Sequence, residues 1–236
     1  MARPQVTHVI FDMDGLLLDT ETAYTVAQKE ILGKYGVEFT WELKAKMMGK
    51  KALDAARVMV EDTGLAGQLD PEDFLRQREA ILDRLFPEAP LMPGADRLLR
   101  HLHANSVPMA VATSSHARHF EIKTQRHREL FGLFDHILTG DMVANGKPAP
   151  DIFLQAAAGF KGGRGPESPA RCLVFEDAPV GVQAAVAAGM PVVLVPDPNL
   201  DSSEVRGAAA IIGSLEGFNP EEWGLPPYPC APEVAN

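Results

Sequence analysis

The stretch Val9–Gly15 (VIFDMDG) is the most informative part of this chain of 236 residues. An apolar run ends there in two aspartates one residue apart, Asp12 and Asp14, and a glycine follows. A continuous apolar run is typical of a strand that is buried on both faces of a parallel sheet. Carboxylates at the end of such a strand lie at the edge where open α/β sheets bind their ligands.

Two aspartates this close repel each other, so the pair indicates a function that needs concentrated negative charge. A hard divalent cation such as Mg²⁺, which prefers carboxylate oxygens and water, satisfies that need. The plainer interpretation of Asp12-x-Asp14-Gly15 is a strand-to-turn junction, where aspartate and glycine are common. The rest of the chain has to decide between these two interpretations.

Further apolar runs predict strands along the chain, and helical patterns separate most of them. The predicted strands are Thr7–Phe11, Pro108–Thr113, His136–Thr139, Cys172–Phe175 and Val192–Val195. This alternation predicts an α/β fold with a doubly wound, parallel (Rossmann-like) sheet.

Some helices of this core have recognisable ends. Pro93-Gly94 introduces a segment whose apolar residues recur at helical spacing, and Asn105 ends it. The alanine-rich segment Asp177–Ala188 stops at Gly189, a residue suited to the left-handed conformation that ends many helices. The tail after about Pro226 is proline-rich, and we expect it to be poorly ordered.

The block from about Leu18 to Leu91 has no convincing strand and several helical patterns. Asp70 is placed to cap a helix that begins at Pro71 and ends at about Leu85. We predict a helical cap domain at residues 18–91, inserted after the first strand of a core domain formed by residues 1–17 and 92–236. The alternative is one crossover connection, which a length of about 70 residues disfavours.

Charge and composition exclude several classes of partner. A net charge of −10 argues against nucleic acid and against an anionic membrane surface. The same charge opposes an anionic substrate, so a phosphate site would need local cations, backbone N–H groups and metal. No apolar stretch approaches the roughly 18 residues of a membrane span, and the early first strand leaves no room for a signal peptide.

Cysteine usage bears on the compartment. The two cysteines, Cys172 and Cys230, do not indicate a disulfide framework, and a reducing compartment fits best. We therefore expect a cytoplasmic protein, or an organellar one if a transit peptide has been removed. A monomer is the default expectation.

Four polar features follow the strands or precede a helix. In chain order they are Asp12-x-Asp14, Thr113-Ser114-Ser115, Gly146-Lys147-Pro148 and Glu176-Asp177. Taken separately, each has an ordinary interpretation, because hydroxyls cap helices, a lone lysine is usually solvated and acidic pairs form turns. Together they place four carboxylates, a hydroxyl and a cation at one edge of one sheet. Such an acidic site requires a metal, and the lysine and hydroxyl then suit a phosphate.

With these four motifs in this order, the sequence resembles the haloacid dehalogenase-like phosphohydrolases over nearly its whole length. The helical insert resembles the small cap of the first cap class in that superfamily. Four segments are more specifically similar to the plant-type glycerol-3-phosphatases and, through them, to the animal pseudouridine-5′-phosphatases. They are Ile10–Thr20, Lys123–Phe131, Gly146–Asp151 and Glu221–Pro227.

The resemblance implies a role for each motif residue. Asp12 is the nucleophile that forms an aspartyl-phosphate, and Asp14 protonates the leaving alkoxide and then activates water. Thr113 binds a phosphate oxygen with the help of the Ser114 backbone N–H. Lys147 neutralises charge between the nucleophile and the phosphate. The aspartate at position 14 indicates phosphate esters and disfavours the dehalogenase reaction.

The resemblance also implies a magnesium site. Asp177, together with Asp12 and the carbonyl of Asp14, would hold Mg²⁺, and Glu176 would support the ion directly or through water. The implied activity is a Mg²⁺-dependent phosphatase for a small phosphorylated alcohol. Glycerol 3-phosphate is the first expected substrate and pseudouridine 5′-phosphate the second. A sugar-phosphate phosphomutase is an alternative, because it shares all four motifs. A signalling receiver is disfavoured because receivers lack a large helical insert, and a scaffold protein is disfavoured because it would not need intact catalytic motifs.

Two basic features of the sequence, the Lys50-Lys51 pair and the segment His116–Arg128, each have two interpretations. Lys50 and Lys51 of the insert could reach a substrate and set specificity, although solvated lysines are the plainer interpretation. The segment His116–Arg128 is rich in lysine, arginine and histidine in an otherwise acidic chain. A solvated or salt-bridged helix face is the plainer interpretation here too, and a contribution to the positive potential of the site is the alternative.

Overall fold

The computed structural model describes residues 5–47 and 52–229 of the chain. Lys50 and Lys51, the predicted cap specificity residues, therefore lie outside the described residues. The chain divides into two compact units. One is formed by Met1–Leu18 and Leu91–Asn236, and the other by Asp19–Pro90. We call them the core unit and the helical unit.

The core unit is built on a six-stranded, wholly parallel sheet in the order β3-β2-β1-β4-β5-β6. Its strands are β1 (His8–Phe11), β2 (Met109–Ala112), β3 (His136–Leu138), β4 (Cys172–Glu176), β5 (Val192–Leu194) and β6 (Ala210–Ile211). The first five agree with the predicted strands, and the doubly wound α/β class is confirmed. The strand β6 was not predicted, because two residues are too few to carry a periodic pattern.

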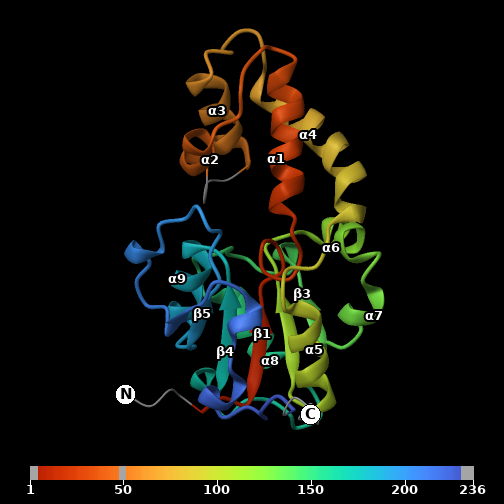
Figure 1. Ribbon diagram of the computed structural model, residues 1–236, viewed down its shortest axis with the longest axis vertical. Helices are drawn as coiled ribbons and strands as arrows, with labels where there is room; N and C mark the ends of the chain where they lie inside the picture. Colours follow the sequence, from red (N-terminus) through yellow and green to blue (C-terminus); the bar gives the residue numbers. More distant parts are fainter. Residues whose placement is uncertain (1–4, 48–51, 230–236) are drawn as a thin grey trace, which may run out of the picture. The chain divides into compact units, whose positions relative to one another are not determined.

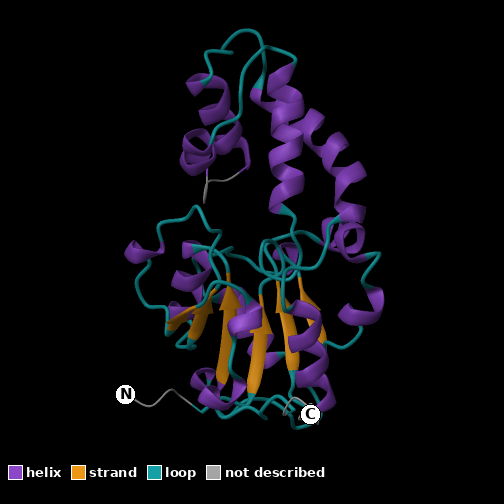
Figure 2. Cartoon of the chain, viewed as in Figure 1, coloured by secondary structure: helices purple, strands orange, loops and turns teal. Residues whose placement is uncertain are grey.

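Alternate residues of the strands face two separate hydrophobic clusters, one on each side of the sheet. Val9 and Phe11 belong to one cluster, and Ile10 between them belongs to the other. This division follows from the two-residue period of a strand, whose successive side chains point to opposite faces. Both faces are therefore apolar, and Figure 2 shows the strands as a central layer with helices on either side.

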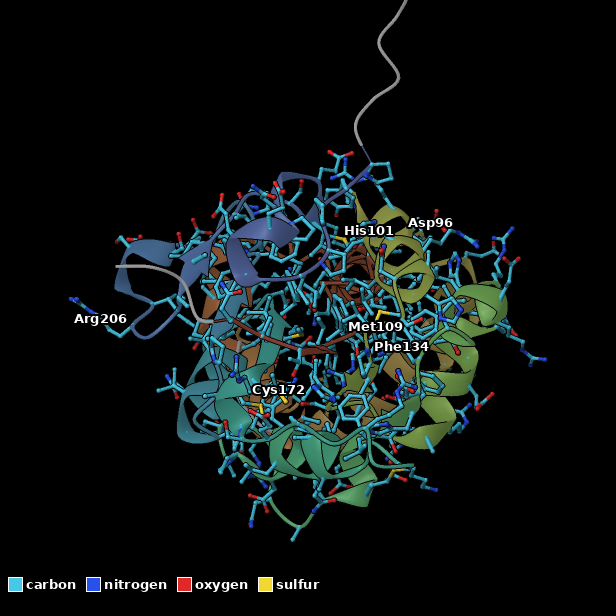
Figure 3. All side chains as sticks on the ribbon, turned by 90° about the horizontal axis from the view of Figure 1, so that it is seen from below. Asp96, His101, Met109, Phe134, Cys172 and Arg206 are labelled. Carbon is cyan, nitrogen blue, oxygen red and sulfur yellow. The ribbon has the colours of Figure 1, made fainter. Side chains whose placement is uncertain are left out.

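Five helices accompany this sheet: α5 (Ala95–Ala104), α6 (Ala117–Thr124), α7 (Arg128–Phe131), α8 (Asp151–Ala158) and α9 (Pro179–Ala187). Leucines of α5 enter the same cluster as Phe11, and residues of α8 and α9 enter the cluster that contains Ile10. In Figure 3 Met109 of β2 and Cys172 of β4 lie within the sheet layer, and His101 of α5 lies to one side of it. Short 3-10 turns complete the core unit at Gly140–Met142, Pro169–Arg171, Ser202–Glu204, Leu215–Gly217 and Pro220–Trp223.

The start of α5 needs a glycine for a steric reason. Gly94 precedes the helix at φ 86°. A Cβ at this position would lie 2.4 Å from the backbone nitrogen of Glu216. The predicted helix over 95–105 is confirmed, because α5 covers Ala95–Ala104 and Asn105 caps it. Its apolar face packs under the segment that contains Glu216.

The helix predicted from Asp177 begins later than expected. α9 starts at Pro179, so Asp177 and Ala178 form a loop between β4 and the helix. Gly189 follows the end of the helix at φ 72°, as predicted. The two-residue loop leaves Asp177 at the carboxyl edge of the sheet, where a side chain can take part in a site.

The C-terminal segment is ordered further than we expected from its prolines. The Tyr228 ring lies 4.5 Å from the His101 ring and 4.3 Å from the Arg97 guanidinium, measured to ring centroids. Nε2 of His101 is 2.8 Å from the carbonyl oxygen of Pro226. The expectation of a poorly ordered tail after Pro226 was therefore wrong as far as Tyr228, because this ring packs on α5.

The helical unit contains α1 (Glu21–Gly33), α2 (Trp41–Met47), α3 (Ala52–Asp62), α4 (Pro71–Leu85) and the 3-10 turn η1 (Phe86–Glu88). The cap of α4 is confirmed, since the Asp70 side chain accepts hydrogen bonds from the backbone N–H groups of Glu72 and Asp73. α4 packs against α1 and α3, and Ile31 of α1 and Phe74 of α4 are both buried. Among the described residues, no helix has the length and apolar character needed to span a membrane.

Candidate active site

Three strand ends bring polar side chains to one edge of the core sheet. The register pairs Phe11 of β1 with Val111 of β2 and with Phe175 of β4. Asp12 and Glu176 are consequently neighbours, and the Asp12 backbone N–H donates to the carbonyl of Phe175 at 3.0 Å. Because all strands are parallel, their carboxyl ends meet at the same edge (Figure 1).

Lys147 is a cation at this edge, and its side chain is buried. It lies in the loop before α8, and its side chain is only 5% exposed. Nζ donates to Oδ1 of Asp12 at 2.5 Å, to Oε1 of Glu176 at 2.6 Å and to the carbonyl of Ala112 at 3.1 Å. Three acceptors satisfy the three donors of an ammonium group, which explains how the charge is tolerated in a buried position.

Glu176 is held as firmly as Lys147. Its Oε2 accepts hydrogen bonds from the backbone N–H groups of Asp177, at 3.1 Å, and Ala178, at 3.3 Å. Gly181 in the first turns of α9 makes room for the carboxylate, because a Cβ there would come within 1.8 Å of Cδ of Glu176. The glycine and the two N–H groups together fix the position of the carboxylate that supports Lys147.

The electrostatics of the pair follow from burial and charge. Burial is the main cause that raises the pKa of Asp12, and the charge of Glu176 also raises it. The charge of Lys147 acts in the opposite direction, and with all these effects together the pKa of Asp12 is about 7. Burial alone would lower the pKa of Lys147, but the nearby carboxylates of Asp12 and Glu176 outweigh it and raise that pKa above its ordinary value. The lysine is therefore permanently charged, and a second cation would favour the ionised form of Asp12.

Asp14 lies just beyond Asp12 and is bound by different partners. Its Oδ2 accepts hydrogen bonds from the hydroxyls of Ser115, at 2.8 Å, and Thr113, at 3.2 Å. Its Oδ1 accepts a hydrogen bond from Nζ of Lys123 at 2.6 Å. The side chain is 22% exposed, so this carboxylate is more open than that of Asp12 at 8%. The two aspartates thus occupy environments of different polarity.

The acidic residues include a candidate metal site. Carboxylate oxygens of Asp12, Glu176 and Asp177 lie within 4.8 Å of one another. All these donors are oxygens of the kind that hard divalent cations prefer. The residues present therefore fit a divalent metal ion.

Most predicted site residues are thus brought together in the core unit. Thr113 is fully buried at the end of β2, and Ser114 next to it is exposed. The Thr113 hydroxyl, which we expected to face a phosphate oxygen, also accepts a hydrogen bond from the backbone N–H of Ser115 at 3.0 Å. The predicted serine and threonine therefore line the same edge as Asp14.

The basic segment His116–Arg128 agrees in part with each of its two interpretations, a solvated helix face and a contribution to the positive potential of the site. Most of its cationic side chains, such as Arg126 and Arg128, are exposed, as the plainer interpretation expected. Lys123 differs because its side chain is 0% exposed and contacts Asp14. One member of the segment therefore contributes its charge directly to the edge where the site lies.

Lys123 and Ser115 belong to segments that our sequence analysis singled out, but it assigned neither residue an individual role in the site. A helical wheel gives a partial signal for Lys123, since it lies four residues after His119 and both are buried on α6. Ser115 follows the predicted Thr113-Ser114 pair directly, but its hydroxyl could have served as a helix cap. Neither signal indicates contact with Asp14, which depends on how α6 packs on the sheet.

Comparison with known proteins agrees with this geometry. Residues 6–189 match the haloacid dehalogenase-like hydrolase family. The (DL)-glycerol-3-phosphatase 2 of Arabidopsis thaliana is 57% identical over 228 residues, covering 96% of this chain and 94% of the relative. A Drosophila melanogaster protein named "Probable pseudouridine-5′-phosphatase" is 52% identical over 227 residues, covering 95% and 96%.

A solved structure shows the same fold. It is a HAD family hydrolase from Deinococcus radiodurans R1 with bound phosphate and sodium. Its TM-score is 0.77 at 26% identity, and the match covers 94% of this chain and 98% of that chain.

The parallel sheet, its acidic edge and the family match over most of the sequence define the class of protein. The chain belongs to the haloacid dehalogenase-like hydrolases. Within that family it is a phosphatase, that is, a phosphoric monoester hydrolase. The resemblance inferred from the four motifs is confirmed.

Proposed function

We propose that the protein hydrolyses glycerol 3-phosphate to glycerol and inorganic phosphate through an aspartyl-phosphate, with Mg²⁺ as cofactor. The observation that carries the proposal is the pairing of one buried lysine, Lys147, with the buried carboxylates of Asp12 and Glu176. The relative at 57% identity that is named a glycerol-3-phosphatase supports the choice of substrate.

The reaction divides into two balanced steps. In the first, an oxygen of Asp12 attacks phosphorus, and the bond between phosphorus and the glycerol oxygen breaks. Protonated Asp14 gives its proton to that oxygen, so glycerol leaves as a neutral alcohol. In the second, Asp14 takes a proton from water as the water oxygen attacks phosphorus. The bond from phosphorus to Asp12 breaks, which releases phosphate and restores the carboxylate.

The remaining residues bind and stabilise the phosphoryl group. Lys147 offsets the negative charge that accumulates between Asp12 and the phosphate, which would otherwise repel each other. The Thr113 hydroxyl, which donates its one proton to Asp14 in this structure, would turn to donate to a phosphate oxygen when the substrate binds. The Ser114 backbone N–H would donate to another phosphate oxygen. Each of these contacts is with the phosphate, so it would be shared by all substrates of the enzyme.

Asp12, the backbone carbonyl of Asp14, Glu176 and Asp177 would hold the Mg²⁺. The clustering of three of their carboxylates supports this assignment. When bound, the ion supplies positive charge that offsets the charge of the transferring phosphoryl group.

The helical unit has the role of a cap in this proposal. It would supply contacts to the alcohol portion of the substrate and exclude bulk water. Lys50 and Lys51 remain predicted specificity residues, since they lie outside the described part of the chain.

Pseudouridine 5′-phosphate is the second candidate substrate, because the Drosophila relative carries that name at 52% identity. The decisive experiment measures kcat/KM for both esters, within a panel of about a hundred phosphorylated metabolites, with Mg²⁺ present. The proposal expects glycerol 3-phosphate to rank first, with release of inorganic phosphate. A higher value for pseudouridine 5′-phosphate would move the assignment to that substrate. Isomerisation of a sugar phosphate without phosphate release would identify a mutase instead.

A further inference from the structure

The side chain of Lys123 is buried where a helix-face lysine would ordinarily be solvated. It projects from α6 and is 0% exposed. Nζ donates to Oδ1 of Asp14 at 2.6 Å and to Oγ of Ser115 at 2.8 Å. A buried ammonium group is unfavourable unless charged and polar partners compensate it, so these contacts account for its position.

The same contacts restrain both oxygens of the Asp14 carboxylate. Lys123 binds Oδ1, and the Ser115 hydroxyl, which Lys123 also contacts, donates to Oδ2 at 2.8 Å. Thr113 adds a second hydroxyl at Oδ2. Lys123 and Ser115 thus form a bridge that fixes the rotation of the carboxylate about its own axis. The lysine itself comes from a helix and is rigidly placed by burial.

We propose that Lys123 is a positioning residue for Asp14, which orients its carboxylate toward the leaving-group oxygen of the substrate. This inference rests on the proposed function, in which Asp14 is the general acid and base. Lys147 has a separate role, because it contacts Asp12 and Glu176. The two buried lysines would therefore serve the two aspartates separately, one the nucleophile and the other the proton carrier.

The need for a proton from Asp14 depends on the leaving group of the substrate. An alkyl phosphate such as glycerol 3-phosphate leaves as a strongly basic alkoxide and needs the proton from Asp14. The leaving group of p-nitrophenyl phosphate is a weak base and can depart without that proton. Because kcat/KM reports the steps up to the departure of the leaving group, misplacing Asp14 should affect the alkyl ester more than the aryl ester.

The test compares Lys123→Met with the unchanged protein, because methionine approximates the volume of the buried stem without its charge. We expect kcat/KM to fall about 10²-fold for glycerol 3-phosphate and less than about fivefold for p-nitrophenyl phosphate. Equal losses on both esters would overturn the proposal, since they would indicate a general structural or electrostatic effect. Arg128→Gln is the matched control, because it removes an exposed cation from the same segment and should leave the ratio of the two values unchanged.

The Asp14→Asn variant separates this inference from the proposed function. The quantity compared is the ratio of kcat/KM for glycerol 3-phosphate to kcat/KM for p-nitrophenyl phosphate. If Asp14→Asn leaves this ratio unchanged, the acid role of Asp14 is refuted and the inference about Lys123 is refuted with it. If it lowers the ratio and Lys123→Met does not, only the role of Lys123 is refuted. Adding Lys123→Met to Asp14→Asn should not lower the ratio further, because the lysine acts through the aspartate.

Ser115→Ala keeps the proposal testable if Lys123→Met does not fold. It removes the hydroxyl that joins Lys123 to Asp14 at a position that is only half-buried. The ratio should fall by several-fold in the same direction, with an unchanged thermal transition. A ratio equal to that of the unchanged protein would contradict the positioning role.

Discussion

At the scale of single residues, the site depends on carboxylates whose negative charge is offset by lysine ammonium groups at hydrogen-bonding distance. Asp12 is almost completely buried and lies 2.5 Å from Nζ of Lys147. Burial without that ammonium group would favour the neutral acid, which is a poor nucleophile. The charge of Lys147 therefore favours the ionised form of Asp12, which is the form that the proposed mechanism needs.

Replacing the nucleophile gives the first prediction. In Asp12→Asn the side chain keeps its shape, but an amide cannot form the phosphoenzyme and offers one anionic ligand fewer to a metal. We expect kcat to fall by roughly 10³-fold or more, while circular dichroism shows an unchanged fold. Residual kcat within about tenfold of the unchanged protein would exclude Asp12 as the nucleophile.

Lys147→Ala should act on all substrates alike. The lysine contacts Asp12 and Glu176, and in the proposed mechanism it acts on the phosphate that all substrates share. Its loss should therefore lower kcat/KM by roughly 10²–10³-fold for alkyl and aryl esters. The melting temperature should also fall, because the buried carboxylates of Asp12 and Glu176 lose their cation. Steady-state kinetics on glycerol 3-phosphate and p-nitrophenyl phosphate test this. A loss confined to one ester would assign Lys147 a role in specificity instead.

At the scale of elements, the strand ends and helix starts determine where the acidic side chains of this edge lie. β4 ends in Glu176, and α9 follows after a loop of two residues, so the helix passes directly beside the carboxylate. Only a residue without a side chain fits at that point of α9, as the 1.8 Å distance from a Cβ at Gly181 to the Glu176 side chain demonstrates. The shortness of this connection therefore determines the residue type.

Gly181→Ala tests that packing. The added methyl group must displace the Glu176 carboxylate, which in turn supports Lys147. We expect kcat/KM to fall by about tenfold to 10²-fold, since displacements near 1 Å in an active site have effects of that size. Gly33→Ala is the control, because it also lies in a helix and a Cβ there meets nothing within 4 Å. Equal activities of the two variants would contradict the steric argument.

At the scale of the whole molecule, the candidate metal site joins parts of the sequence that are far apart. Asp12 comes from the end of β1, whereas Glu176 and Asp177 come from the end of β4. No single segment of the chain can form this cluster. The adjacency of β1 and β4 in the centre of the sheet brings the two segments together.

Metal removal provides the prediction at this scale. Excess chelator should abolish activity, and Mg²⁺ should restore it. Ca²⁺ should support less activity, since it takes more oxygen ligands at longer distances. Binding of Mg²⁺ should also raise the melting temperature of the protein as the Mg²⁺ concentration increases, because a ligand that binds the folded state stabilises that state by mass action. Asp177→Asn should weaken this thermal shift, whereas full activity in chelator would refute the site.

How far the sequence predicts the structure can be judged from particular elements. The strands β1 and β4 are continuous apolar runs that end in acids, and such runs identify both the strand and its functional end. The cap of α4 was predictable because Asp70 bonds only to N–H groups two and three residues away. In each case the deciding interactions are local or follow the period of the element.

Other features could not be predicted because they depend on contacts between distant residues. The strand β6 exists only by pairing with β5, and Tyr228 is ordered only because α5 offers Arg97 and His101. Neither the pairing of β6 nor the contacts of Tyr228 can be inferred from the residues next to them in the sequence. An exposed strand and a flexible tail would have similar sequences.

The parallel α/β class, the helical insert and the carboxylates at the strand ends are encoded in the order of residues and in the hydrophobic period, so they could be predicted. Which charges meet depends on long-range packing, which pairs Lys147 with Asp12 and Glu176, and Lys123 with Asp14. A lysine in a polar segment has the same local signature whether it is solvated or buried. Its free energy depends on the carboxylate that folding brings next to it, and that partner lies 109 residues away for Lys123.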